Sequence, residues 1–194
     1  MTTLEFYKND PIHIAISNLE TGKAALYGLI LLKTVRQYPS CVAVSSSFLA
    51  RYNGTIDLHI KRIFHTTPAP SWQDMMQTYE GLLDEAIELG DNALESCICI
   101  PHYLASFEVN GDLNNILYAN VSFLGFCDYI SQEYEIKERR PSEARIASSK
   151  TMSAYRVLTN QLILSLNTDG VTDPNLLEKL SDHFRETIRD FLVS

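Results

Sequence analysis

Alternation of apolar and polar positions marks the first predicted element. Isoleucine occupies every second position of residues 12–17, a period of two that is typical of a half-buried strand following the breaker Pro11. The apolar positions then change to helical spacing. Thr21 is a candidate cap for a helix over residues 21–37, and Pro39 lies just beyond its end.

A β-hairpin is predicted next. Two runs rich in β-prone residues, 41–51 and 56–64, flank the pair Asn53-Gly54. Both residue types accept the positive φ that a type I′ turn requires, so this pair is a strong hairpin signal. Because strand side chains alternate between faces, the polar residues of the second strand share one face. They are Asp57, His59 and Lys61.

The second half of the chain is predicted to be mainly helical. A helix over residues 71–90 begins at Ser71, which forms a capping-box pattern with Asp74. Residues 95–109 contain Pro101 and are interpreted as an edge strand or hairpin, because sheet edges tolerate proline. Three further helices are predicted from Asp112 to about Arg139, from Ser142, and from Asp173 with Pro174 at the first helical position.

The order of these elements defines the expected fold class. Strand, helix, strand, strand, helix, strand matches the split βαβ arrangement, so we predict an α+β fold with a ferredoxin-like βαββαβ part over about residues 12–109 and three C-terminal helices. Residues 1–194 are expected to form a single domain, with an α+β portion (1–110) and a helical portion (111–194) packed on it. The alternative is a mostly helical protein in which residues 41–65 form a small β-hairpin.

Charge is distributed unevenly along the chain. The 194 residues include 16 Lys and Arg and 24 Asp and Glu, for a net charge of -8. Residues 63–136 contain no Lys or Arg, so the excess of negative charge lies in the middle of the sequence. This balance argues against direct binding of nucleic acid, which depends on attraction to phosphate.

The acids of the predicted helix over residues 71–90 are regularly spaced. Glu80, Asp84, Glu88 and Asp91 recur at intervals of four, four and three residues, which places them on one stripe. We interpret the stripe as a docking face for a basic protein partner. The alternative is a solvated face that keeps the protein soluble. A group of basic residues follows later in the chain: Lys137, Arg139 and Arg140. This group could pair with the acidic stripe of another copy, so a homo-oligomer is also expected.

A catalytic alternative depends on the predicted sheet. Its first and third strands would be neighbours, which would place His13 near Asp57, His59 and Lys61 on an open face. Two imidazoles, a carboxylate and an ammonium group can support acid–base chemistry on a phosphate ester. This alternative describes a small hydrolase or phosphoesterase. Paired-histidine phosphoesterases carry Ser or Thr two residues after each histidine, whereas the positions here are Ala15 and Lys61.

No cofactor or metal site is expected from the sequence. Cys97, Cys99 and His102 lack a second ligand pair at the usual zinc spacing. The first twenty residues do not resemble a targeting signal, and the longest strongly apolar stretch, 24–32, is about half of the roughly 20 residues needed to cross a bilayer. The sequence therefore favours a non-enzymatic, cytoplasmic interaction or regulatory protein without a membrane segment.

Overall fold

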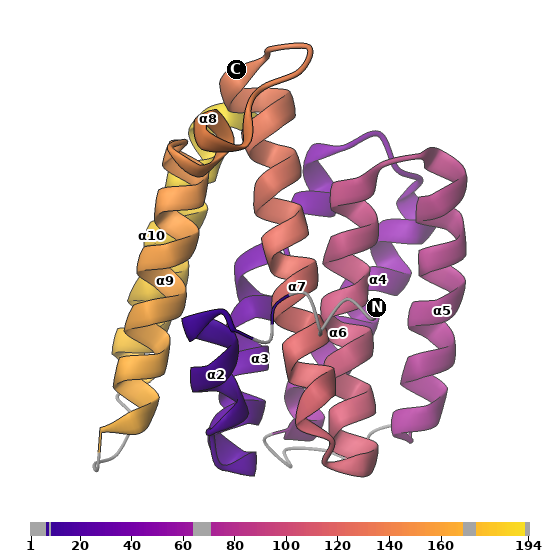
Figure 1. Cartoon of the computed structure of the whole chain (residues 1–194). Coiled ribbons are helices and arrows are strands. Elements are labelled where there is room, and N and C mark those ends of the chain that lie inside the picture. The colour runs from indigo at the N-terminus through magenta and orange to yellow at the C-terminus, as the bar shows by residue number, and fades with distance from the viewer. Residues whose placement is uncertain (1–6, 8, 64–70, 169–173, 193–194) are drawn as a thin grey trace.

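Helices lie side by side and run alternately up and down in the computed structural model of the chain (Figure 1). The structure describes residue 7 and residues 9–63, 71–168 and 174–192. Its elements are α2 (Pro11–Ser17), α3 (Thr21–Val35), the 3₁₀ helix η1 (Tyr38–Cys41), α4 (Ser46–Ile63), α5 (Trp72–Leu89), α6 (Asn92–Asn110), α7 (Leu113–Ile130), the π-helix η2 (Ser131–Ile136), α8 (Glu143–Ala147), α9 (Lys150–Asn167) and α10 (Pro174–Leu192).

Helices α3, α6 and α7 form the centre of the bundle. Helix α6 packs against both α7 and α3, and α5 packs against α6. Helix α4 packs on α5, while α9 and α10 pack on each other and on α3 (Figure 1). The shared core is apolar and contains Leu31, Leu104, Phe123 and Phe126, each 0% exposed. Burial of such side chains is the main driving force for this packing.

The predicted α+β ferredoxin-like fold is wrong, because the described residues between 12 and 109 form helices and no strand. The first predicted strand is helix α2. The carboxylate of Asp10 accepts a hydrogen bond from the backbone N–H of Ile12 at 2.8 Å, and Pro11 occupies the first helical position. This cap and proline start a helix, and they outweigh the local alternation of isoleucines.

Helix α4 replaces the predicted hairpin. Its buried side chains include Phe48, Tyr52, Ile56 and His59, whose spacing of four, four and three residues is helical. The Asn53-Gly54 pair lies in the middle of this helix rather than in a turn. The same helix rules out the small hairpin of the alternative interpretation.

Helix α6 replaces the predicted edge strand. Asp91 caps the helix by accepting a hydrogen bond from the N–H of Leu94 at 2.9 Å, and Gly111 ends it in the left-handed conformation with φ of 68°. Pro101 is buried inside this helix. The interior proline, which costs a helix one backbone hydrogen bond, is therefore tolerated by packing on both sides.

The predicted caps of α5 and α7 are confirmed, whereas Thr21 is the first residue of α3 and Glu20 occupies the N-cap position. The backbone N–H of Asp74 donates to Ser71 Oγ at 3.1 Å, and the N–H of Ser71 donates to Asp74 Oδ2 at 3.1 Å, which completes the capping box of α5. Asp112 caps α7 by accepting from the N–H of Asn114 at 3.0 Å. Helix α10 begins at Pro174, whereas Asp173 lies outside the described residues.

The helix predicted from Ser142 is divided in two. Its first part is α8, and the hydroxyl of Ser149 then caps α9 by accepting from the N–H of Met152 at 3.1 Å. Two further contacts stabilise the start of α9: the carboxylate of Glu135 accepts from the N–H of Lys150 at 2.6 Å and from that of Thr151 at 3.0 Å.

A buried polar chain joins three helices of the bundle. Tyr27 of α3 donates its hydroxyl hydrogen to Asn120 Oδ1 of α7 at 2.7 Å. The amide of Asn120 in turn donates to the hydroxyl of Tyr155 in α9 at 3.2 Å. Because Asn120 is 0% exposed, these bonds replace those it would make with water and fix the relative positions of the three helices.

Gly54 provides a test of α4. A Cβ added there would meet nothing within 4 Å, so alanine fits without strain. Gly54→Ala should raise the free energy of unfolding by about 0.5–1 kcal/mol, because alanine is the better helix former. Urea denaturation measures this change. Destabilisation by the alanine would contradict the helix and favour a turn with positive φ at this position.

Candidate interaction surface

The orientation of α5 is set by its buried side. Met75, Tyr79, Leu82 and Ala86 are at most 2% exposed and pack into the bundle. Their spacing of four, three and four residues forms one stripe along the helix. The opposite stripe of α5 must therefore face solvent.

Three predicted partner-binding residues occupy that outer stripe. Glu80, Asp84 and Glu88 are all exposed, and we call this set the acidic face. Glu80 Oε1 lies 3.6 Å from His102 Nε2 of α6. Asp84 and Glu88 form no ion pair with any residue that the structure describes. Two of the three carboxylates thus remain available to a cation from outside.

Asp91, the fourth predicted residue, has a structural role. It lies at the start of α6, where its side chain caps the helix, and it is only partly exposed. The hydroxyl of Tyr38 in η1 also donates to Asp91 Oδ2 at 3.3 Å. Burial, followed by the nearby charge of Asp91, raises the pKa of Tyr38. Asp91 therefore holds η1 against α6 and is less available to a partner.

Two apolar side chains accompany the acidic face. Ile87 is 54% exposed and Leu89 is 55% exposed, near the C-terminal end of α5. Ile87 follows Asp84 by three residues and thus lies on the same stripe of the helix. The sequence reasoning missed both residues. For Ile87 the available signal was its position outside the buried stripe. Leu89 follows Ala86 by three residues, so helical spacing alone places it on the buried side.

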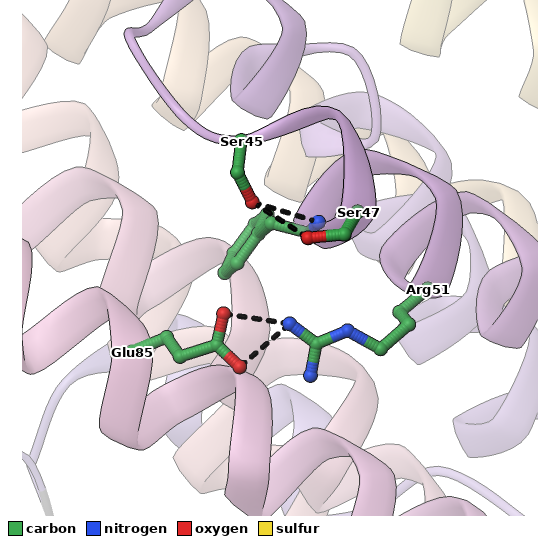
Figure 2. Close-up of polar contacts among 5 residues, drawn as sticks. Ser45, Ser47, Arg51 and Glu85 are labelled. Atoms are coloured by element: carbon green, nitrogen blue, oxygen red, sulfur yellow. Dashed lines mark hydrogen bonds and ion pairs between the residues drawn. The ribbon is translucent and has the colours of Figure 1, made fainter.

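Glu85 is engaged within the protein. Arg51 of α4 donates to both oxygens of Glu85 in α5, each at 2.6 Å, and Figure 2 shows the two side chains reaching toward each other. Ser45 Oγ lies 3.0 Å from Ser47 Oγ at the start of α4, and the same view draws this contact. Both charged side chains are more than 40% exposed, so the ion pair contributes at most about 1 kcal/mol to stability. It helps to align α4 beside the acidic face.

His59 is enclosed in the protein. It is 0% exposed, its Nδ1 lies 2.9 Å from the hydroxyl of Tyr79, and its ring contacts Trp72 with centroids 4.9 Å apart. Burial lowers the pKa of His59 to about 3, because the low-dielectric surroundings disfavour the charged imidazolium. Its enclosed position leaves a substrate no route to the imidazole from solvent.

The other predicted catalytic residues lie apart from this imidazole. His13 of α2 is 4% exposed and stacks on Tyr7, and burial lowers its pKa although Asp10 opposes the shift. Asp57 is ion-paired with Arg36 at 2.6 Å, and Lys61 is exposed. The open sheet face on which their juxtaposition depended does not exist in the described residues, because α4 is a helix and turns His59 inward.

The candidate zinc ligands also have other surroundings. Cys97 is fully buried, and burial raises the pKa of the Cys99 thiol to about 11. His102 faces Glu80, as described above. Across the described ranges, no three His, Cys, Asp or Glu side chains lie close enough together to hold a metal ion.

A cleft of about 330 Å³ lies between α10 and the end of α3 with η1. Its walls carry cations and acids together, among them Arg189 and Glu186. A second cation of the cleft, Arg185, is paired with Asp182. The opposite charges balance, so the cleft shows no preference for an anionic or a cationic ligand.

Comparison of this chain with protein-family models, with curated proteins and with solved structures finds no match. Within the described part of the chain, no helix combines the length and the apolar character needed to cross a membrane.

The buried imidazole of His59 predicts a pH dependence of stability. Between pH 6.5, the usual histidine pKa, and about pH 3, the unfolded chain binds a proton at this position that the folded protein excludes. The free energy of unfolding should therefore fall as the pH drops, with a contribution from His59 of about 2 kcal/mol between pH 7 and pH 5. Denaturation at both pH values measures this loss.

Two variants isolate the contribution of His59. His59→Asn keeps a polar atom near Tyr79 but cannot take up the proton, so its loss of stability between pH 7 and pH 5 should be smaller. His183→Gln removes an exposed imidazole as a control. An equal loss in the wild type and in His59→Asn would contradict the assignment.

Proposed function

We propose that this chain is a non-enzymatic, cytoplasmic interaction or regulatory protein that binds a basic protein partner through the acidic face of α5. The observation that carries the proposal is the pair of exposed carboxylates, Asp84 and Glu88, with no ion-pair partner in the described chain. They project from a helix whose other side is firmly packed. Such a surface needs no conformational change to meet a cationic partner.

The chemistry of the surface defines the partner. Lysine or arginine side chains at helical spacing would pair with Asp84 and Glu88, and an apolar recess beside them would accept Ile87. Exposed apolar side chains within a charged rim are typical of protein interfaces. The long-range attraction would accelerate association and would weaken as salt screens it.

A second copy of the chain is a candidate partner for the same face. Arg139 and Arg140 are exposed, and neither forms an ion pair with a described residue. Both precede α8, on the α9 side of the bundle, whereas α5 lies on the other side (Figure 1). This separation favours contact between copies over contact within one copy.

Charge reversal tests the acidic face. Asp84→Lys with Glu88→Lys should weaken capture of the partner at least about tenfold, because two attractive contacts become repulsive. Immobilised wild type and variant are compared for the proteins they retain from a cell extract, and an identified partner is then titrated at low and high salt. The melting temperature should stay unchanged or rise slightly, because a lysine at position 84 follows Glu80 by four residues and cations suit the C-terminal end of α5.

A matched control makes the same change of net charge elsewhere. Glu20→Lys with Glu133→Lys reverses two exposed acids outside α5 and outside residues 137–145, and should leave capture unchanged. Equal retention of basic proteins by all three proteins would contradict a role of the acidic face, and equal loss in both variants would indicate an effect of net charge alone.

Self-association has a separate test. Sedimentation velocity of the wild type should show a larger mean mass at low salt than at high salt, and Arg139→Glu with Arg140→Glu should remove the difference. Mixing this variant with the Asp84→Lys, Glu88→Lys protein should restore a pairwise complex, because each then contributes its intact face. A wild type that stays monomeric at low salt contradicts self-association but leaves a different basic partner open to the capture experiment.

A further inference from the structure

Ser142 ends an exposed segment without helical structure between η2 and α8. Residues 137–142 follow the π-helix, and Lys137 leaves it in the left-handed conformation with φ of 55°. Ser142 itself is exposed and has an extended backbone, with φ of -72° and ψ of 153°. Segments of this kind are where enzymes reach a folded protein, because backbone and side chains are accessible together.

Basic side chains precede this serine closely. Arg139 and Arg140 stand three and two residues before Ser142, and both are exposed. Neither forms an ion pair with a described residue, whereas Arg145 lies 3.5 Å from Glu138. Two guanidinium groups beside the hydroxyl are therefore available to carboxylates on another protein.

The hydroxyl group of Ser142 is also available. Its oxygen accepts a hydrogen bond from the backbone N–H of Arg145 at 3.2 Å. Among the described residues it donates to no acceptor, so its proton and a lone pair face solvent. These are the features that a phosphoryl acceptor needs.

We propose that Ser142 is a phosphorylation site for a serine/threonine protein kinase that selects basic segments. Such kinases discriminate substrates by charge pattern, and carboxylates of the kinase would pair with Arg139 and Arg140. Ser142 Oγ attacks the γ-phosphorus of Mg-bound ATP, and an O–P bond forms. The bond from that phosphorus to the bridging oxygen breaks, ADP leaves, and the hydroxyl proton passes to the catalytic base of the kinase.

The structure separates Ser142 from two other hydroxyls with the same sequence signal. Ser148 and Thr159 each follow an arginine by three residues. Ser148 has a helical backbone, and its hydroxyl donates to the carbonyl oxygen of Arg145 at 2.9 Å. Thr159 is 0% exposed. Only Ser142 of the three combines an extended backbone with an accessible hydroxyl.

Phosphorylation would change the electrostatics of this segment. Residues 137–145 contain four cations and two acids, so their net charge is +2. A phosphoserine adds roughly -1.5 to -2 at neutral pH and would nearly cancel it. The modified segment would lose its attraction for anionic surfaces, including the acidic face of a second copy, while the acidic face of α5 itself stays unchanged. The phosphorylation site does not depend on the proposed function, because it is argued from residues 137–145 alone.

The experiment uses the full chain, Mg-ATP and the catalytic subunit of cyclic-AMP-dependent protein kinase as the probe. Mass spectrometry maps the phosphate and its stoichiometry, and initial rates give kcat/KM. We expect one phosphate per chain at Ser142. Ser142→Ala should lose it, Ser142→Thr should retain it, and Ser148→Ala should react like the wild type.

The arginines supply the quantitative test. Arg139→Ala with Arg140→Ala should lower kcat/KM for Ser142 at least about tenfold, because two charge pairs with the kinase are lost. Lys150→Ala removes an exposed cation outside the segment as the control. Absence of phosphate at Ser142, its appearance mainly at Ser148, or an unchanged rate without the two arginines would each overturn the proposal. Circular dichroism of every variant confirms that the fold is intact.

Discussion

Burial of one stripe of α5 is the constraint on which the candidate surface depends. Met75, Tyr79 and Leu82 are sealed in the bundle, and each such side chain contributes about 1.5–3 kcal/mol when it is fully buried. Like charges four residues apart cost only a few tenths of a kcal/mol per pair. Burial therefore dominates, and the helix keeps Asp84 and Glu88 together in solvent despite their repulsion.

The secondary structure could be predicted from the sequence where the helix-cap residue and the spacing of the apolar residues indicate the same element. The capping residue Ser71 and the long apolar stripe that follows it correctly predict α5, because both signals are local and indicate the same structure. In α4 they disagree. Asn53-Gly54 favours a turn, but Phe48 and Ile56 reach the core only if the backbone is helical. The burial of these side chains decides between turn and helix, and it depends on packing against α5. Because α5 lies outside residues 46–63, a prediction from these residues alone fails.

The candidate surface was predictable to the extent that it follows from helix geometry alone. The exposed stripe of α5 needs only the period of 3.6 residues and one buried side. The contacts of Glu85 with Arg51 and of Asp91 with Tyr38 join residues 34 and 53 positions apart, and no spacing rule supplies them. The contact of Asp91 removes one of the four predicted acids from the set available to a partner, which is why the acidic face in the structure is smaller than the predicted one. The contact of Glu85 keeps a further acid of α5 from joining it.

The two charged regions belong to one scaffold with fixed geometry. The bonds from Tyr27 through Asn120 to Tyr155 hold α3, α7 and α9 in register, and α6 carries α5 on the other side of the same core. Asn120 left without either partner would be an unsatisfied buried amide, so the bonds resist sliding of these helices. A partner that contacts α5 therefore meets carboxylates whose positions are already set, and binding costs less conformational entropy than it would with a flexible acidic segment.

The basic segment at residues 137–145, by contrast, includes an irregular stretch in which an enzyme can reach the backbone. Rigidity on one side and accessibility on the other fit the two regions for different kinds of contact.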